Sequence, residues 1–132
     1  MDNNHNQPCP FCNQDKAEVI QANEHSFAIY DGFPVTAGHT LIVPKRHIAS
    51  FFEATREEQA ALFDLLAKIR KLLQKVRNPD GFNIGINDGA AAGQTVMHLH
   101  IHLIPRYAGD TEDPRGGVRW IMPKNAPYWK KQ

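Results

Sequence analysis

The chain has 132 residues, with 15 Lys and Arg against 14 Asp and Glu and a formal net charge of +1. This length fits one compact domain, and an apolar fraction of 42% is sufficient for a packed core. Because the charge is nearly balanced and no basic stripe or tail is present, a protein that binds nucleic acid through its phosphate backbone is not expected.

The first segment, residues 1–16, is polar and contains the only two cysteines, Cys9 and Cys12. A polar start without a following apolar stretch predicts no targeting or membrane segment, and therefore a cytoplasmic protein with no membrane partner. The Cys-x-x-Cys spacing cannot build a disulfide framework, but it leaves a metal-binding or a redox pair open.

Three β-favouring segments follow at residues 19–22, 26–30 and 40–43, separated by turn residues, and they predict an antiparallel meander. A helix is then expected from Thr55, because Thr55 and Glu58 form a capping-box pattern and apolar residues recur every three or four positions up to Val76. The helix should end before the turn residues 78–81.

Beyond the helix, residues 82–86 alternate as a strand, and residues 94–105 are the longest strand candidate. Residues 108–132 are rich in prolines and turn signals, which predicts an irregular tail whose aromatic residues pack against the domain or a partner. These elements predict an α+β fold of one domain, residues 1–132, with an antiparallel sheet of about five strands and one main helix.

Three histidines alternate in the last strand candidate. In a strand, His98, His100 and His102 would share one face, and the opposite face would carry Met97, Leu99, Ile101 and Leu103. Burying three unpartnered imidazoles is costly, so this face should be solvated, bind a ligand or be buried with hydrogen-bond partners, and the alternation of three histidines favours a ligand. The spacing leaves two chemistries open: three ligands for one catalytic zinc, or an imidazole nucleophile with supporting imidazoles.

The segment from Gly93 to Arg106 resembles the histidine triad motif, His-φ-His-φ-His-φ-φ, where φ is apolar. The resemblance continues upstream through residues 26–31, 38–47 and 87–89 and covers roughly residues 8–107. The residues on either side of the motif are most similar to the fragile histidine triad branch and to bacterial diadenosine tetraphosphate hydrolases. The resemblance implies the histidine triad fold and a nucleotide hydrolase, usually a homodimer.

The resemblance also implies a role for each matching residue. His100 would attack the α-phosphorus of a dinucleoside polyphosphate to form a nucleotidyl-histidine, and His102 and Gln94 would contact the phosphate. His39 would support the triad. The nucleotide would be held by Asp31 at its ribose and by further residues around it: Asn87, Ile29 and Thr95.

In zinc-bearing bacterial relatives, two histidines complete a site with the Cys-x-x-Cys pair. The matching residues here are His47 and His98, so the resemblance implies a closed structural zinc site of Cys9, Cys12, His47 and His98. No organic cofactor is expected, because neither a P-loop nor a Rossmann glycine pattern is present.

Three alternatives stay open at this point. The first is a zinc metallohydrolase that binds one metal with all three triad histidines. The second is a purine nucleoside phosphoramidase, and the third is a nucleotide-binding regulatory protein with little turnover.

Overall fold

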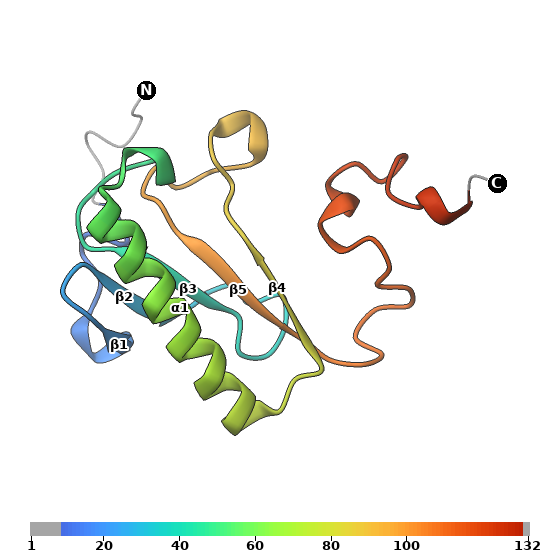
Figure 1. Cartoon of the computed structure of the whole chain (residues 1–132), viewed down its shortest axis with the longest axis horizontal. Helices are drawn as coiled ribbons and strands as arrows, with labels where there is room; N and C mark the ends of the chain where they lie inside the picture. Colours follow the sequence, from blue (N-terminus) through green and yellow to red (C-terminus); the bar gives the residue numbers. More distant parts are fainter. Residues whose placement is uncertain (1–8, 131–132) are drawn as a thin grey trace.

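The computed structural model describes residues 9–130 and contains one sheet and one long helix (Figure 1). The first eight residues of the expected N-terminal segment lie outside the described part. The strands are β1 (Val19–Ala22), β2 (Ser26–Tyr30), β3 (Thr40–Pro44), β4 (Gly81–Gly85) and β5 (Ile101–Arg106). All neighbours are antiparallel, in the order β1-β2-β3-β5-β4. The predicted α+β fold is confirmed.

The helix α1 spans Arg56–Arg77, as its sequence signals predict. The Thr55 hydroxyl accepts a hydrogen bond from the Glu58 backbone N–H, and the Glu58 carboxylate accepts one from the Thr55 N–H. Asn78 ends the helix in the left-handed conformation, with φ of 49°. The buried apolar residues of α1 recur on one face: Leu62, Leu65, Ile69 and Leu73.

The sheet has two different faces. The face beneath α1 contributes Ala28, Ile42, Ile101 and Leu103 to the main core, and Leu99, just before β5, joins them. The opposite face carries a smaller cluster of Phe27, Ile29, Leu41 and Val43, on which Phe11 and Val19 pack. This second face is only partly covered by other elements, and the candidate site lies on it.

The expected strand at residues 94–105 is wrong in its first half, because β5 begins only at Ile101. The ladder between β3 and β5 ends at the pair Ile42 and Ile101. The carbonyl oxygen of Pro44, two residues further along β3, accepts a hydrogen bond from the His98 ring. The Leu99 N–H donates instead to the Ile48 carbonyl oxygen, so the segment before β5 is held by the loop after β3.

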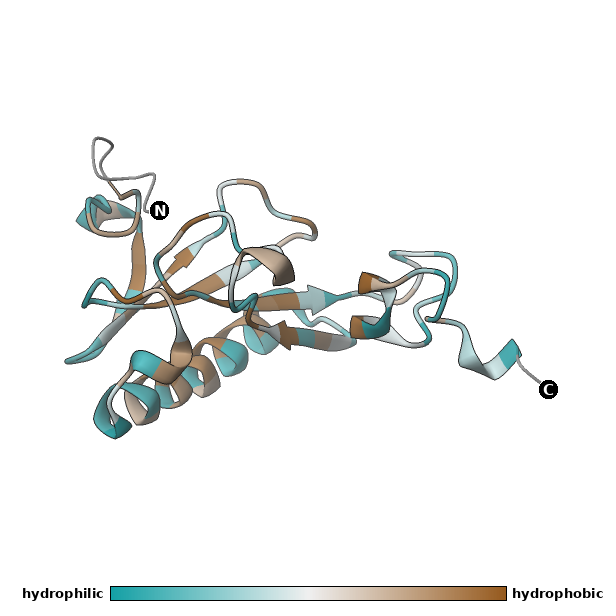
Figure 2. Cartoon of the chain, turned by 90° about the horizontal axis from the view of Figure 1, so that it is seen from above, coloured by the Kyte–Doolittle hydropathy of each residue, from teal (hydrophilic) through white to brown (hydrophobic). Residues whose placement is uncertain are grey.

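The remaining elements are short 3-10 turns: Lys16–Glu18, Phe51–Glu53, Ala90–Ala92, Gly117–Ile121 and Tyr128–Lys130. The last two belong to the tail, which projects away from the sheet and helix (Figure 2). None of the helices in residues 9–130 is long and apolar enough to cross a membrane.

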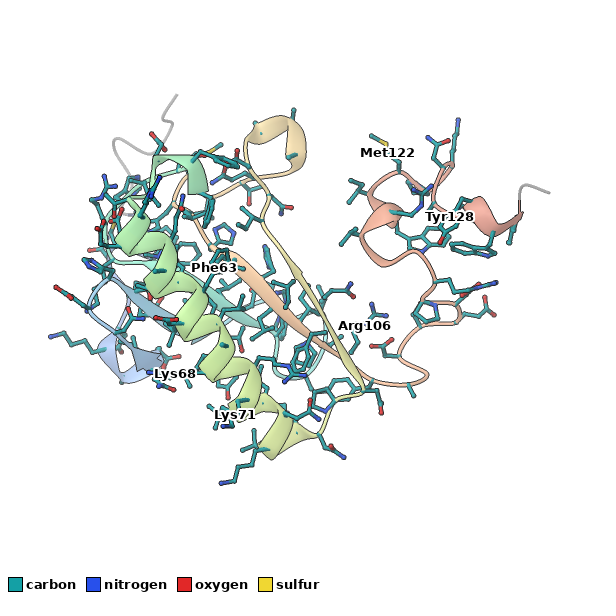
Figure 3. The ribbon with its side chains drawn as sticks, in the orientation of Figure 1. Phe63, Lys68, Lys71, Arg106, Met122 and Tyr128 are labelled. Atoms are coloured by element: carbon teal, nitrogen blue, oxygen red, sulfur yellow. The ribbon has the colours of Figure 1, made fainter. Side chains whose placement is uncertain are left out.

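The described part of the tail contains only short 3-10 turns, and its aromatic residues pack on one another rather than on α1. The rings of Trp120 and Trp129 lie 6.5 Å apart, and the Arg115 guanidinium lies 4.6 Å from the Trp129 ring. Met122 and Tyr128 are more than half exposed and lie well away from Phe63 of α1 (Figure 3).

Candidate active site

A cavity of about 640 Å³ lies on the face of the sheet opposite α1. Seven of the residues expected to bind substrate or catalyse line it together: Ile29, Asp31, His39, Asn87, Thr95, His100 and His102. The sequence did not single out other lining residues, among them Phe11, Tyr30 and Phe33. Phe33 is 91% exposed, so it forms an apolar rim for this cavity that no chain segment covers among residues 9–130.

The ring of His100 is held by the backbone just before it. Its Nδ1 lies 2.8 Å from the carbonyl oxygen of His98. A carbonyl oxygen only accepts, so Nδ1 carries the proton. In the neutral ring Nε2 then has a free lone pair, which is the protonation state that a nucleophile or a metal ligand requires.

The ring of His39 connects the loop before β3 to the triad. Its Nδ1 accepts a hydrogen bond of 3.1 Å from the Val35 backbone N–H, and its Nε2 lies 2.9 Å from Nδ1 of His102. Because Nδ1 of His39 is an acceptor, Nε2 must be the donor toward His102. This leaves His102 with its proton on Nε2, where it can donate to an anion in the cavity.

Burial keeps both of these histidines neutral. Loss of hydration, together with the neighbouring His100 and His39, lowers the pKa of His102 to about 4, against an opposing effect of Asp31. Burial also lowers the pKa of His39, against an opposing effect of the Asp31 carboxylate. The hydrogen bonds from Val35 through His39 to His102 require neutral rings, because each ring must accept with one nitrogen and donate with the other.

Asp31 lies at the end of β2, where its carboxylate has two contacts. Its Oδ1 accepts a hydrogen bond of 2.8 Å from the Phe33 N–H, which shapes the turn. Its Oδ2 lies 3.4 Å from Nε2 of His39. The residue is half-buried and lines the cavity, so the turn role and an acceptor role toward a ligand are compatible.

Gln94 does not occupy the expected position at the phosphate. It is 6% exposed and does not line the cavity. Its side-chain oxygen accepts from the Gly89 N–H, and its amide donates to the carbonyl oxygens of Ala49 and Val96. These backbone bonds use its donors and acceptor, so Gln94 holds the loop 89–96 in place beside the cavity.

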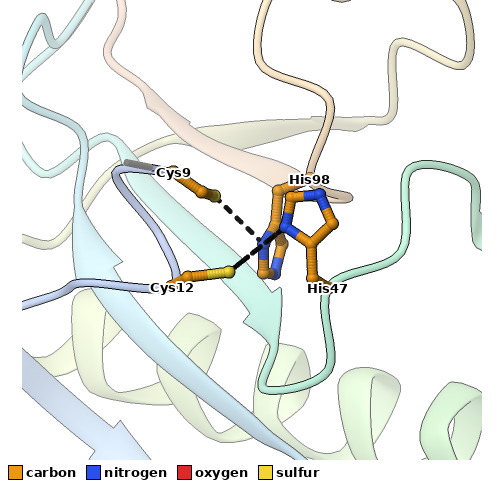
Figure 4. A group of neighbouring side chains, drawn as sticks. All are labelled: Cys9, Cys12, His47 and His98. Carbon is orange, nitrogen blue, oxygen red and sulfur yellow. Dashed lines mark hydrogen bonds between the residues drawn. The ribbon is translucent and has the colours of Figure 1, made fainter. Parts of the chain in front are cut away.

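A second group of side chains, shown in Figure 4, joins the N-terminal segment to the triad. The ligand atoms of Cys9, Cys12, His47 and His98 all lie within 4.8 Å of one another. Nδ1 of His98 lies 3.4 Å from Cys9 Sγ and 3.1 Å from His47 Nδ1, and Cys12 Sγ lies 3.2 Å from His47 Nδ1. When zinc is bound tetrahedrally, two nitrogen ligands, or a nitrogen and a sulfur ligand, lie about 3.3–3.6 Å apart.

The orientation of His98 suits a metal ligand. The ring is fully buried, and its Nε2 lies 2.8 Å from the Pro44 carbonyl oxygen, to which it must donate. Nδ1 is therefore the nitrogen with the free lone pair, and it faces the two cysteines. A backbone acceptor on the other nitrogen is the usual support of a ligating histidine. The residues present thus fit a closed four-ligand zinc site.

This arrangement argues against one metal held by all three triad histidines. The free nitrogen of His98 faces the cysteines, whereas His100 and His102 line the cavity. Within residues 9–130, the other group close enough to share an ion is Asp31, His39 and His102. There Nε2 of His39 carries a proton, because Val35 donates to Nδ1, so it offers no lone pair to a metal.

Comparisons with known proteins identify the relatives of this chain. A family model described as "HIT domain" matches residues 13–109. The asymmetrical bis(5'-nucleosyl)-tetraphosphatase of Schizosaccharomyces pombe is 36% identical over 94 residues, which are 71% of this chain and 52% of that protein. The bis(5'-adenosyl)-triphosphatase of Dictyostelium discoideum is 39% identical over 98 residues, 74% of this chain and 66% of that protein.

A solved structure of a Zn-bound histidine triad family protein from Mycobacterium smegmatis superposes with a TM-score of 0.71 at 36% identity. The match covers 80% of this chain and 79% of that one.

Proposed function

Since this chain belongs to the HIT domain family, we propose that it is a nucleotide hydrolase that cleaves a dinucleoside polyphosphate at its α-phosphate. The observation that carries the proposal is the His100 ring, whose Nδ1 proton is held by the His98 carbonyl so that Nε2 has a free lone pair. The relatives named as a tetraphosphatase and a triphosphatase support this substrate class.

The reaction would proceed in two displacements at phosphorus. First, Nε2 of His100 forms a bond to the α-phosphorus, and the bond from that phosphorus to the bridging oxygen breaks. The bridging oxygen keeps the electron pair and leaves with the remaining phosphates. Water then attacks the nucleotidyl-histidine, the electron pair of the N–P bond returns to Nε2, and a nucleoside monophosphate and a proton are released.

The other residues of the cavity would bind and orient the substrate. The Nε2 proton of His102 would donate to a non-bridging phosphate oxygen, where negative charge builds up in the transition state. Asp31 would accept hydrogen bonds from the ribose hydroxyls. Ile29, Asn87 and Thr95 would contact the nucleoside, and Gln94 would position the loop that carries Thr95.

Cys9, Cys12, His47 and His98 would hold a structural zinc ion. When bound, the ion would join the N-terminal segment to the loop after β3 and to the segment before β5. Because all four positions would be filled by protein, it would supply no step of the reaction. We also expect a homodimer.

The test is a substrate panel on the wild type and on His100→Ala, with mass spectrometry of enzyme quenched and denatured at alkaline pH, where the P–N bond of a nucleotidyl-histidine survives. The panel contains diadenosine tetraphosphate, diadenosine triphosphate and adenosine 5'-phosphoramidate. We expect the wild type to hydrolyse the dinucleotides and to carry a nucleotidyl adduct on His100, and the variant to do neither. Full turnover by His100→Ala would overturn the mechanism.

The panel also separates the remaining alternatives. Preference for the phosphoramidate would assign a phosphoramidase, and tight binding without hydrolysis would assign a regulatory nucleotide-binding protein.

A further inference from the structure

A second cavity, of about 470 Å³, lies next to the candidate active site. The two cavities share Phe11 and Gln14 in their linings, so they are adjacent. The Phe11 ring lies 5.1 Å from the His100 ring, centroid to centroid. The second cavity is therefore separated from the proposed nucleophile by little more than one aromatic ring. We call it the lysine cavity, because Lys16 and Lys45 line it.

The sheet register places the lysine cavity on the same face as the active site. Ile29 pairs with Leu41, and Leu41 pairs with His102, so these three lie in one row across the sheet. Phe27, which lines the lysine cavity, is two residues from Ile29 and pairs with Val43. Side chains two residues apart share a face, about 7 Å apart. An extended ligand could follow this face from one cavity to the other.

The charge of the lysine cavity suits phosphate groups. Both lysines are exposed, and within residues 9–130 neither makes an ion pair with a carboxylate. The next residue, Arg46, shows the contrast, because its guanidinium binds the Glu58 carboxylate with two hydrogen bonds. Two ammonium groups that have no carboxylate partner among residues 9–130 lie beside an apolar wall, which suits an anionic ligand with a flat ring.

The size of the lysine cavity also agrees with a ligand site. Its volume lies within the range of about 300–1,000 Å³ that is usual for small-molecule sites. Val19 and Phe27 supply apolar wall, and the Phe27 side chain is 8% exposed. A dinucleoside polyphosphate has a second nucleoside beyond the cleaved bond, and the first cavity holds the residues proposed for only one.

We propose that the lysine cavity binds the distal half of a dinucleoside polyphosphate. The phosphates beyond the cleaved bond would contact the ammonium groups of Lys16 and Lys45, and the second base would pack against Phe11 and Phe27. This inference rests on the proposed function and extends it by naming where the leaving group is held. It predicts selectivity for substrates whose leaving group is itself a nucleotide.

The kinetic test compares two substrates on charge-reversed variants. The double variant Lys16→Glu, Lys45→Glu is measured with diadenosine tetraphosphate and with adenosine 5'-phosphoramidate, whose leaving group is only ammonia. We expect the ratio of the two kcat/KM values to shift against the dinucleotide by at least about tenfold. The matched control is Lys68→Glu, Lys71→Glu on the exposed face of α1, which leaves the ratio unchanged.

A binding test does not depend on turnover. His100→Ala is titrated by calorimetry with diadenosine tetraphosphate and with AMP, with and without the two lysine substitutions. The lysine substitutions should weaken dinucleotide binding by at least about tenfold and AMP binding much less. The variant Lys16→Ala, Lys45→Ala, with circular dichroism as a folding check, gives a milder change of the same sign.

The outcomes separate the two proposals. If the wild type hydrolyses both substrates and neither the kinetic ratio nor the dinucleotide affinity responds to the lysines, the lysine cavity is not the distal subsite, although the proposed function stands. If the wild type hydrolyses no substrate but the dinucleotide affinity depends on the lysines, the subsite is supported and the hydrolase proposal is overturned.

Discussion

Nε2 of His39 lies 2.9 Å from Nδ1 of His102, and this contact determines which nitrogen of His102 faces the cavity with a proton. The Val35 N–H donates to the other nitrogen of His39, so the direction of donation from His39 to His102 is determined by the backbone. A loop amide thus sets the tautomer of a proposed phosphate-binding residue two side chains away.

The first prediction concerns His39 as a positioning residue. His39→Ala removes the donor to His102 and allows the wrong tautomer, so we expect kcat to fall about tenfold to hundredfold, the range seen when an orienting partner of a functional histidine is removed. KM should change little, because His39 acts on the substrate only by orienting His102. His39→Gln, whose amide can still donate, should recover part of kcat. Equal losses in the two variants would contradict the tautomer argument.

The second prediction concerns the proposed zinc. His47→Ala should reduce the zinc content, measured by mass spectrometry of metals, from about one ion per chain to well below that, and should lower Tm, because metal binding stabilises only the folded chain. His25→Ala is the matched control, since His25 belongs to neither group of candidate ligands. Unchanged zinc content in His47→Ala would rule out the four-ligand site.

The third prediction concerns Asp31 and the ribose. Asp31→Ala should raise KM for a ribonucleotide substrate by about tenfold or more, because it removes a charged acceptor of hydrogen bonds. A substrate that lacks the ribose hydroxyls of the cleaved nucleotide should bind wild type weakly and lose little more in the variant. Additive losses in this double-mutant cycle would show that Asp31 and the hydroxyls do not interact.

The fourth prediction concerns pH and stability. Hydrogen bonds from Arg46, together with the one from the Thr55 backbone N–H, lower the pKa of Glu58 to about 2. The unfolded chain binds this proton near 4.5, so the folded state is stabilised above that pH and loses the stabilisation as pH falls toward 2.

Glu58→Gln therefore tests the ion pair and the cap together. We expect the variant to be less stable at pH 7 by about 1–2 kcal/mol, since Glu58 is buried and caps α1. The difference from wild type, measured by urea unfolding across pH, should shrink as pH falls from 4.5 toward 2. Glu57→Gln on the exposed surface of the same turn is the control. A difference that is constant with pH would exclude the carboxylate as its source.

The limits of α1 and the positions of most strands follow from the sequence by itself. The capping box of Thr55 and Glu58 and the turn at Asn78 act over three or four residues, so local pattern is enough to predict them. The alternation of Leu99, Ile101 and Leu103 likewise placed these residues in the core under α1. Seven of the residues that the family resemblance implies for substrate binding or catalysis line one cavity.

Tertiary structure decided the orientation of the polar groups. Whether residues 94–100 continue the strand depends on Pro44 and Ile48, which lie some fifty residues earlier in the chain and take up the hydrogen bonds of His98 and Leu99. Gln94 turns from the cavity because Gly89, Ala49 and Val96 satisfy its amide.

Hydrogen-bond partners from distant parts of the chain also orient the histidines of the motif differently. His98 turns toward Cys9, 89 residues away in sequence, whereas His102 receives a hydrogen bond from His39, 63 residues away. Spacing along the chain shows which residues can share a face. Which nitrogen carries the proton, and which ligand each ring can bind, is set by hydrogen-bond partners that only folding brings together.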